Sequence, residues 1–146
     1  MNNELKLENQ LCFPLYAAAR KVTSAYTPLL KPLGITYTQY IVLMVLWDQK
    51  EVTVGKLGER LYLDNGTLTP LLKKLEQEGY VIRTRSKEDE RSVIVSLTEK
   101  GSALKEKCAS IPSSVGSCIP LEPDEAITLY GLLYKVLNKI NAEDPE

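Results

Sequence analysis

Apolar residues recur along most of this chain with the 3.6-residue period of amphipathic helices. In residues 36–49 they occupy positions i, i+3, i+4 and i+7, which predicts a helix with one buried face. A short helix is expected over 53–61, with a threonine as its N-cap. The next is expected to begin near Asp64–Thr67 and to end at Gly79, because Pro70 must lie in a first turn. Further helices are expected from Pro14 to the breaks at 28–34, over 98–118 with an interruption at Pro112, and over 123–141.

Between residues 79 and 98 the pattern changes to the two-residue period of β-strands. Val93, Val95 and Leu97 occupy alternate positions of one run. An earlier run reads YVIRTRS, and the charged sequence KEDER lies between the two runs. This pattern predicts a β-hairpin. Two short helices joined by a tight, Gly-containing turn precede it, which is typical of a helix-turn-helix. The sequence therefore predicts a mainly α fold with a small β-hairpin wing, in the α+β class.

The length of the chain, 146 residues, is that of a single domain. Within it we expect a winged helix-turn-helix over residues 36–97, flanked by helices over 1–33 and 98–141. The flanking helices present apolar surface so broad that it requires a partner. We therefore expect a homodimer that is held together by these flanking segments.

Composition excludes several classes of protein. The chain has no histidine, which excludes His-based metal sites, a Ser-His-Asp triad and a Cys-His dyad, and its three cysteines form no CxxC pair. We therefore expect no enzyme, no metal and no cofactor. No apolar run approaches the roughly 20 residues of a membrane helix, and the N-terminus MNNELKLENQ lacks the apolar core of a signal peptide. These features predict a cytoplasmic protein without a membrane partner.

The net charge of −1 and an isoelectric point near 5.7 differ from the strongly basic balance of many nucleic-acid-binding proteins. The charges are unevenly distributed, with eleven basic and nine acidic residues over 53–107 but two basic and six acidic residues over 108–146. The prediction of DNA binding therefore depends on local pattern and not on total charge.

The second helix of a helix-turn-helix places its N-terminal residues on base edges in the major groove. Hydroxyl and amide groups there contact bases or phosphates, lysines contact phosphates, and wing arginines reach phosphates or a narrow minor groove. The alternative interpretation is a solvated hairpin that never meets DNA. The candidate DNA-binding residues are Asn65, Thr67, Thr69, Lys73 and Lys74 in the helix, and Arg83, Arg85, Lys87 and Arg91 in the wing.

The stretch from Asp89 to Gly101 fits the pattern D-x-R-x-x-x-V-x-L-T-x-x-G and resembles the wing signature of the MarR family of bacterial transcription regulators. More narrowly, LENQLCFPLYAAARKV, ITYTQYIVLMVLW and LYLDNGTLTPLLKKLE resemble the organic hydroperoxide-sensing repressors of that family, called OhrR. The resemblance covers about residues 5–107. It implies that Arg91 enters the minor groove and that Asp89 helps to hold it. A two-fold dimer implies double-stranded DNA with an inverted repeat as the partner.

A candidate peroxide sensor lies at the start of the first helix. Pro14 marks the first turn, so Cys12 lies at the positive end of a helix dipole, which favours the reactive thiolate. A thiolate attacks a peroxide and becomes a sulfenic acid. The alternative is a buried, inert cysteine. The resemblance to OhrR favours the sensor and implies an organic hydroperoxide as the effector.

The resemblance also implies that two tyrosines, at Tyr26 and Tyr37 in this sequence, hydrogen-bond the reactive cysteine. Tyr26 lies 14 residues after Cys12, so on one continuous helix the two are about 21 Å apart. They cannot touch within one subunit. If they share a site, Tyr26 comes from the partner chain.

By its location in SVGSCIP, Cys118 resembles the resolving cysteine that some of these sensors use to form a disulfide with the reactive cysteine of the other subunit. Others use a small cellular thiol instead. Cys108 is expected to be a packed helix residue. Such a disulfide in the cytosol is transient and sensory.

The sequence thus predicts a repressor that releases its operator when Cys12 is oxidised. The alternatives are a MarR-type repressor controlled by a small lipophilic or phenolic ligand, a thiol peroxidase that uses Cys12 and Cys118, and a protein-interaction module without DNA affinity.

Overall fold

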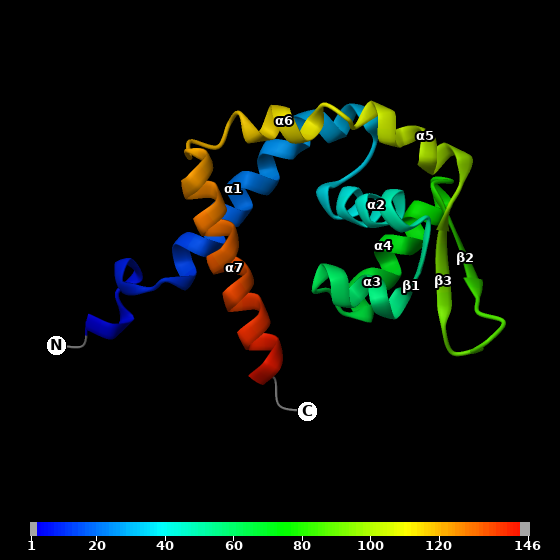
Figure 1. Cartoon of the computed structure of the whole chain (residues 1–146), viewed down its shortest axis with the longest axis horizontal. Helices are drawn as coiled ribbons and strands as arrows, with labels where there is room; N and C mark the ends of the chain where they lie inside the picture. The colour runs from blue at the N-terminus through cyan, green and yellow to red at the C-terminus, as the bar shows by residue number, and fades with distance from the viewer. Residues whose placement is uncertain (1–2, 144–146) are drawn as a thin grey trace. The chain divides into compact units, whose positions relative to one another are not determined.

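Three helices supply nearly half of the buried apolar residues of the core. In this computed structural model, which describes residues 3–143 and the side chains of 3–139, these helices are α2 (Tyr37–Gln49), α3 (Val54–Leu61) and α4 (Asn65–Gln77). Their apolar stripes face one another, and the helices gather beside a small sheet (Figure 1). The most deeply buried side chains of this core, each 1% exposed or less, include Leu43, Leu46, Leu57, Leu68, Leu72 and Leu75.

The other elements precede and follow this core along the chain. Two 3-10 turns, Asn3–Leu5 and Leu7–Asn9, lead into α1 (Cys12–Leu30), and a third, Lys31–Leu33, follows it. After α4 come strands β2 (Val81–Arg85) and β3 (Val93–Leu97), then α5 (Glu99–Lys107), α6 (Ile111–Gly116) and α7 (Pro123–Glu143). Residues 1–2 of the expected first dimerisation segment and residues 144–146 lie outside the described part.

The chain forms two compact units, Met1–Val115 and Gly116–Glu146. The first contains the core, the sheet and the helices from α1 to most of α6. The second contains α7, whose described apolar side chains are largely exposed; Ile127 is 73% and Tyr130 64% exposed. No single helix among the described residues is long and apolar enough to span a membrane. The bent pair Cys12–Leu33 and Tyr37–Gln49 is together long and apolar enough by length and composition. Most apolar residues of α2 are buried in the core.

Local side-chain chemistry fixes where the core helices begin. The Thr36 hydroxyl accepts the N–H of Gln39 while the Gln39 side chain accepts the N–H of Thr36, a capping box at the start of α2. Thr53 caps α3, as predicted. Asp64 caps α4 by accepting the N–H of Thr67 at 2.7 Å, which confirms the predicted start.

Some predicted boundaries are wrong by a few residues. The first helix begins at Cys12 and not at Pro14, and it continues through Pro28 to Leu30. Pro70 is the sixth residue of α4, so the helix tolerates a proline in its second turn. The break between α5 and α6 falls at 108–110, and Pro112 follows it as the second residue of α6, where its missing N–H has no helical partner to lose.

The predicted hairpin forms and gains a third strand. Strand β3 is the central one and pairs antiparallel with β2 on one side and with β1 (Glu51–Thr53) on the other. Val52 faces Val95 in one ladder, and Arg83 faces Val95 in the other. The sequence pattern missed β1 because three residues are too few to show a period. The mainly helical fold with a small antiparallel sheet confirms the predicted fold class.

Candidate nucleic-acid interface and redox site

The buried stripe of α4 determines which of its residues face solvent. Leu68, Leu72 and Leu75 lie in the core at 1% exposure or less. The five predicted DNA-contacting residues of this helix therefore lie on its outer faces. The Thr69 hydroxyl donates to the carbonyl of Asn65 at 2.8 Å, which leaves its oxygen as an acceptor. The exposed residues are Asn65, Thr67, Thr69, Lys73 and Lys74.

A close backbone approach sets the angle between α3 and α4. A Cβ on Gly58 would lie 2.6 Å from the carbonyl oxygen of Leu63, so a larger residue there would push the turn away from α3. Tyr62 ends α3 in the left-handed region, with φ of 56°. The glycine and this turn present the first turn of α4 to solvent.

The tip of the wing is held by its own side chains. The Asp89 carboxylate accepts the backbone N–H of Arg91 at 3.0 Å, and Arg85 donates to the carbonyl of Glu90 at 2.8 Å. Asp89 therefore holds the backbone of Arg91, while the side chain of Arg91 itself stays exposed. Lys87 and Arg91 are both exposed at the tip.

Arg83 has a structural partner that the sequence did not indicate. Its guanidinium lies 3.1 Å from the Glu76 carboxylate, and its backbone N–H donates to the same carboxylate at 2.9 Å. The two bonds join the base of the wing to the last turns of α4. Hydrogen bonds from Arg83 hold the pKa of the Glu76 carboxyl below its usual range. Arg83 thus joins the base of the wing to α4, whereas the side chains of Lys87 and Arg91 are exposed.

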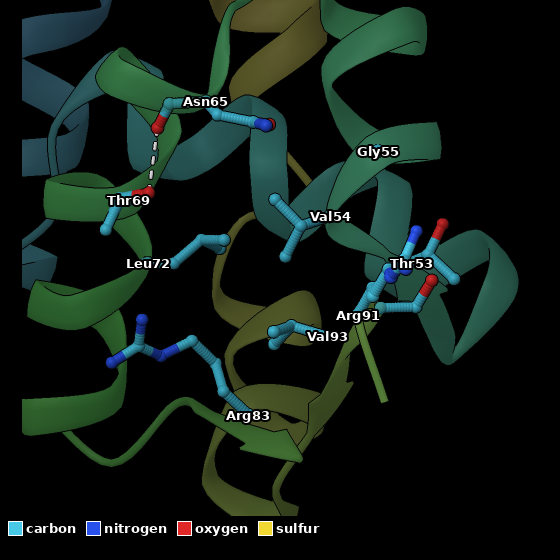
Figure 2. Close-up of a pocket in the computed structure, with 10 residues that line it drawn as sticks. Thr53, Val54, Gly55, Asn65, Thr69, Leu72, Arg83, Arg91 and Val93 are labelled. Atoms are coloured by element: carbon cyan, nitrogen blue, oxygen red, sulfur yellow. Dashed lines mark hydrogen bonds between the residues drawn. The ribbon is translucent and has the colours of Figure 1, made fainter. Parts of the chain in front are cut away.

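A hollow of about 430 Å³ lies between α4, the start of α3 and the wing. Figure 2 shows Arg83 and Arg91 approaching it from the wing and Asn65 and Thr69 from α4. Arginines, an amide and hydroxyls around one hollow suit the phosphates and base edges of a nucleic acid. The remaining lining residues are Thr53, Val54, Gly55, Leu72, Ser92 and Val93.

Glu76→Gln is expected to lower the free energy of unfolding at neutral pH by no more than about 1 kcal/mol, since partly exposed ion pairs contribute little. A carboxyl whose pKa is lowered by folding contributes stability above its unfolded pKa, and this is lost as the pH falls through the folded value. The difference between Glu76→Gln and the unsubstituted protein should therefore shrink in acid. Urea unfolding across this pH range measures it. Glu106→Gln, on the exposed face of α5, is the control. A difference that persists unchanged in acid would contradict the role of the ion pair.

The tyrosines that the sequence pairs with the redox site lie side by side. The ring centroids of Tyr26, on α1, and Tyr37, at the start of α2, are 4.9 Å apart. Tyr40 packs against both, with centroids 5.7 Å from Tyr26 and 6.4 Å from Tyr37. Burial and the neighbouring Tyr26 raise the pKa of the Tyr37 hydroxyl. It therefore stays protonated at neutral pH and can donate a hydrogen bond.

Cys12 is the exposed first residue of α1 and is far from this tyrosine pair within one chain. Because α1 is continuous from Cys12 to Leu30, Cys12 and Tyr26 are separated by about 21 Å of helix axis. Exposed apolar side chains surround the cysteine, with Leu11 75% and Phe13 43% exposed. The structure thus brings the two tyrosines together but leaves Cys12 of the same chain apart from them.

The other two cysteines differ in accessibility. Cys108 is 3% exposed at the end of α5, and burial raises the pKa of its thiol, which opposes thiolate chemistry. Cys118 is exposed and belongs to the second unit, between α6 and α7. Among the described residues, no group of three or more His, Cys, Asp or Glu is placed to hold a metal ion.

Three residues of interest were missed from the sequence. Tyr40 and Trp47 were assigned only to the apolar stripe of the 36–49 helix, yet they extend the tyrosine pair along α2. The three-residue spacing of Tyr37 and Tyr40 is the local signal that could have found the first. Glu76 gave no signal, because its partner lies on a different element.

Comparisons with known proteins agree with this geometry. A family model described as transcriptional regulator SarA/Rot matches residues 24–108. The chain is 49% identical over 142 residues to the organic hydroperoxide resistance transcriptional regulator of Bacillus subtilis, covering 97% of each protein. This chain belongs to the MarR/SarA family of DNA-binding transcriptional regulators. The identity to the Bacillus regulator also confirms the resemblance to the OhrR group.

Solved structures of the MarR/SarA family place this fold on DNA. Reduced AbfR bound to DNA aligns with a TM-score of 0.77 and 38% identity, over 92% of this chain and 93% of AbfR, a protein of Staphylococcus epidermidis. A disulfide form of AbfR aligns with a TM-score of 0.67 and 37% identity, over 92% and 91%. A mutant MarR from E. coli complexed with operator DNA aligns with a TM-score of 0.79 and 31% identity, over 87% and 93%. The Bacillus relative and the matching family model are both described as transcriptional regulators.

Proposed function

We propose that this protein is a homodimeric repressor that senses organic hydroperoxides through Cys12 and releases its operator when Cys12 is oxidised. The observation that carries the proposal is the contact of Tyr26 with Tyr37, a helix length away from the Cys12 of the same chain. A thiol of a second chain at this pair would complete a sensing site of one cysteine and two phenols.

The chemistry at the proposed site begins with the Cys12 thiolate, whose negative charge the two phenol hydroxyls stabilise by donating hydrogen bonds. The thiolate attacks the terminal oxygen of the hydroperoxide, so that an S–O bond forms and the O–O bond breaks. The sulfur loses two electrons and becomes a sulfenic acid, and the peroxide leaves as an alkoxide that takes up a proton to become the alcohol. The phenols then face a neutral sulfenic acid, which alters the contacts that join the two subunits.

Unpartnered apolar surface supports the dimer. Around Cys12, Leu11, Phe13 and Tyr16 are all exposed, and Tyr16 is 61% exposed. On α7, in the other unit, Leu132 is 54% exposed. Soluble monomers rarely leave so much apolar surface in water. We propose that residues 1–33 and 98–141 bury these faces against a second copy.

On DNA, the two recognition helices α4 of the dimer would enter successive major grooves of an inverted repeat. Asn65, Thr67 and Thr69 face base edges, with Lys73 and Lys74 near phosphates. Lys87 and Arg91 extend the contact from the wing, with Asp89 fixing the tip and Arg83 and Arg85 supporting it. A protein with this role acts where the chromosome is, in the cytoplasm.

Cys118 is our proposed resolving residue. Its thiol would attack the sulfenic acid of a partner's Cys12, forming an S–S bond and releasing water. Its exposure and the disulfide form of AbfR support this step.

The experiment that tests the proposed function is fluorescence anisotropy of labelled promoter DNA containing an inverted repeat. Reduced protein is expected to bind this DNA, to lose it after addition of cumene hydroperoxide and to bind again after treatment with dithiothreitol. Hydroperoxide-insensitive binding would contradict redox sensing, and binding to no promoter fragment at low salt would contradict a repressor.

A mixed dimer tests whether the site is shared between subunits. Cys12→Ser and Tyr26→Phe homodimers each lack an intact site and should respond poorly to peroxide. In a mixed dimer of the two chains, a shared site leaves Cys12 of one chain opposite Tyr26 of the other. One of the two sensing sites is then intact, so peroxide-dependent release of DNA should return. Co-expression with two affinity tags yields the mixed dimer for the anisotropy measurement. A mixed dimer as unresponsive as its parents would place cysteine and tyrosine in the same subunit's site.

A further inference from the structure

The proposed sensing pair is the first part of a longer row of aromatic rings. Tyr40 packs against Tyr26 and Tyr37 and is 3% exposed, so it is fixed in the core. About two helical turns further along α2, Trp47 packs edge-on against Tyr40, with ring centroids 6.2 Å apart and an interplanar angle of 70°. The row therefore runs from the sensing pair to the far end of α2, through side chains in direct contact.

At that end, Trp47 is hydrogen-bonded to α5. Its indole N–H donates to the carbonyl oxygen of Gly101 at 2.9 Å, across 54 residues of sequence. Gly101 is the third residue of α5, in the first turn of the helix. The indole thus holds the first turn of α5 against α2 by a directional bond as well as by packing.

The first turn of α5 is in turn fixed to the DNA-binding elements. A Cβ on Gly101 would overlap the carbonyl oxygen of Tyr80, so the helix backbone lies directly on the start of the wing. The Thr98 hydroxyl donates to the carbonyl of Gly79 at 2.6 Å, and Lys100 donates to the carbonyl of Glu78 at 2.7 Å. Glu78 and Gly79 end the recognition helix, so a displacement of this turn displaces the end of α4 and the base of the wing together.

We propose that Trp47 is a positioning residue that couples the state of the Tyr26–Tyr37 pair to the recognition helix and wing, through its contact with Tyr40 and its hydrogen bond to Gly101. This inference rests on the proposed function, because it takes the tyrosine pair as the group whose contacts change when Cys12 is oxidised. When the sensing contacts change, the aromatic row transmits the displacement to the first turn of α5. Without the indole N–H, the row still packs but no longer holds α5.

Trp47→Phe tests the coupling, because phenylalanine keeps an aromatic ring against Tyr40 and removes the donor. We expect reduced Trp47→Phe protein to bind promoter DNA within about threefold of the unsubstituted protein, and its Cys12 to be oxidised by cumene hydroperoxide at the same rate, measured by thiol titration. The loss of DNA affinity on oxidation should be smaller by about tenfold or more. Met44→Leu, an exposed position on the same helix, is the control and should respond normally. A Trp47→Phe protein that is oxidised and releases DNA as fully as the unsubstituted protein overturns the proposal.

A second measurement needs no substitution of Trp47 and remains valid if the variant does not fold. Trp47 is the single tryptophan of the chain, so its emission reports this contact directly. Oxidation by cumene hydroperoxide should change the emission of the unsubstituted protein, without DNA present, and leave that of Cys12→Ser unchanged. Unchanged emission in protein that has lost DNA affinity overturns the coupling alone. If the unsubstituted protein keeps its DNA after complete oxidation of Cys12, the proposed function fails, and the coupling fails with it.

Discussion

Cys12→Ser protein is expected to keep its operator at hydroperoxide concentrations that release the unsubstituted protein. A serine hydroxyl stays protonated at neutral pH and forms no sulfenic acid, so the sensing site cannot change state. Allosteric coupling typically changes affinity by about 5- to 150-fold, and the unsubstituted protein should lose affinity within that range while the variant loses none. Anisotropy titrations of reduced and peroxide-treated protein measure both affinities. Because residue 12 is exposed, the reduced variant should bind DNA normally.

The remaining cysteines supply matched controls for this result. Cys108→Ser removes a buried thiol and should leave the peroxide response intact, even if it lowers stability. Cys118→Ser should still release DNA through the sulfenic acid, but form no disulfide-linked dimer on a non-reducing gel. If Cys12→Ser responds to peroxide as fully as the unsubstituted protein, control by a small ligand replaces control by oxidation as the better explanation.

Arg91→Ala should produce the largest loss of operator affinity among the wing substitutions. The guanidinium is exposed at a tip that Asp89 fixes through the backbone. The backbone of the tip is therefore already ordered, and only the side chain must be ordered on DNA. Removing a well-placed arginine contact costs about 1–3 kcal/mol, which corresponds to a loss of roughly 5- to 150-fold in affinity. The slope of log affinity against log salt should also fall by about one, because one fewer counterion is released. Anisotropy at several salt concentrations measures both.

Two further variants separate the geometry of Arg91 from its charge. Arg91→Lys keeps the charge and loses the planar fork, so it should retain the salt dependence and recover only part of the affinity. Lys107→Ala removes an equal charge from the last turn of α5 and should change affinity by no more than about twofold. If Arg91→Ala loses no more operator affinity than Lys107→Ala, Arg91 is not part of the DNA interface.

Local chemistry explains why much of the core could be predicted. Thr53 and Asp64 cap α3 and α4 by accepting N–H groups three residues further on. Such short-range bonds can be predicted from a few neighbouring residues. Apolar residues occupy alternate positions in the second wing strand, and a charged segment separates it from the first. This local pattern is enough to predict a hairpin. The expectations that were wrong, the start of α1 at Pro14 and the placing of Pro70 in a first turn, fail for one reason: each proline lies further from the helix start than its usual position.

The sequence by itself determined the order of helices and strands, the exposed face of the recognition helix, and a family resemblance that comparison with known proteins confirmed. Only the tertiary structure decided what each polar or aromatic side chain contacts. It assigned Arg83 to Glu76, joined Tyr26 to Tyr37, and bonded Trp47 to Gly101. The reason is physical. Periodicity and capping depend on residues within one turn, whereas these contacts join residues 7 to 54 positions apart, whose meeting depends on how the elements pack.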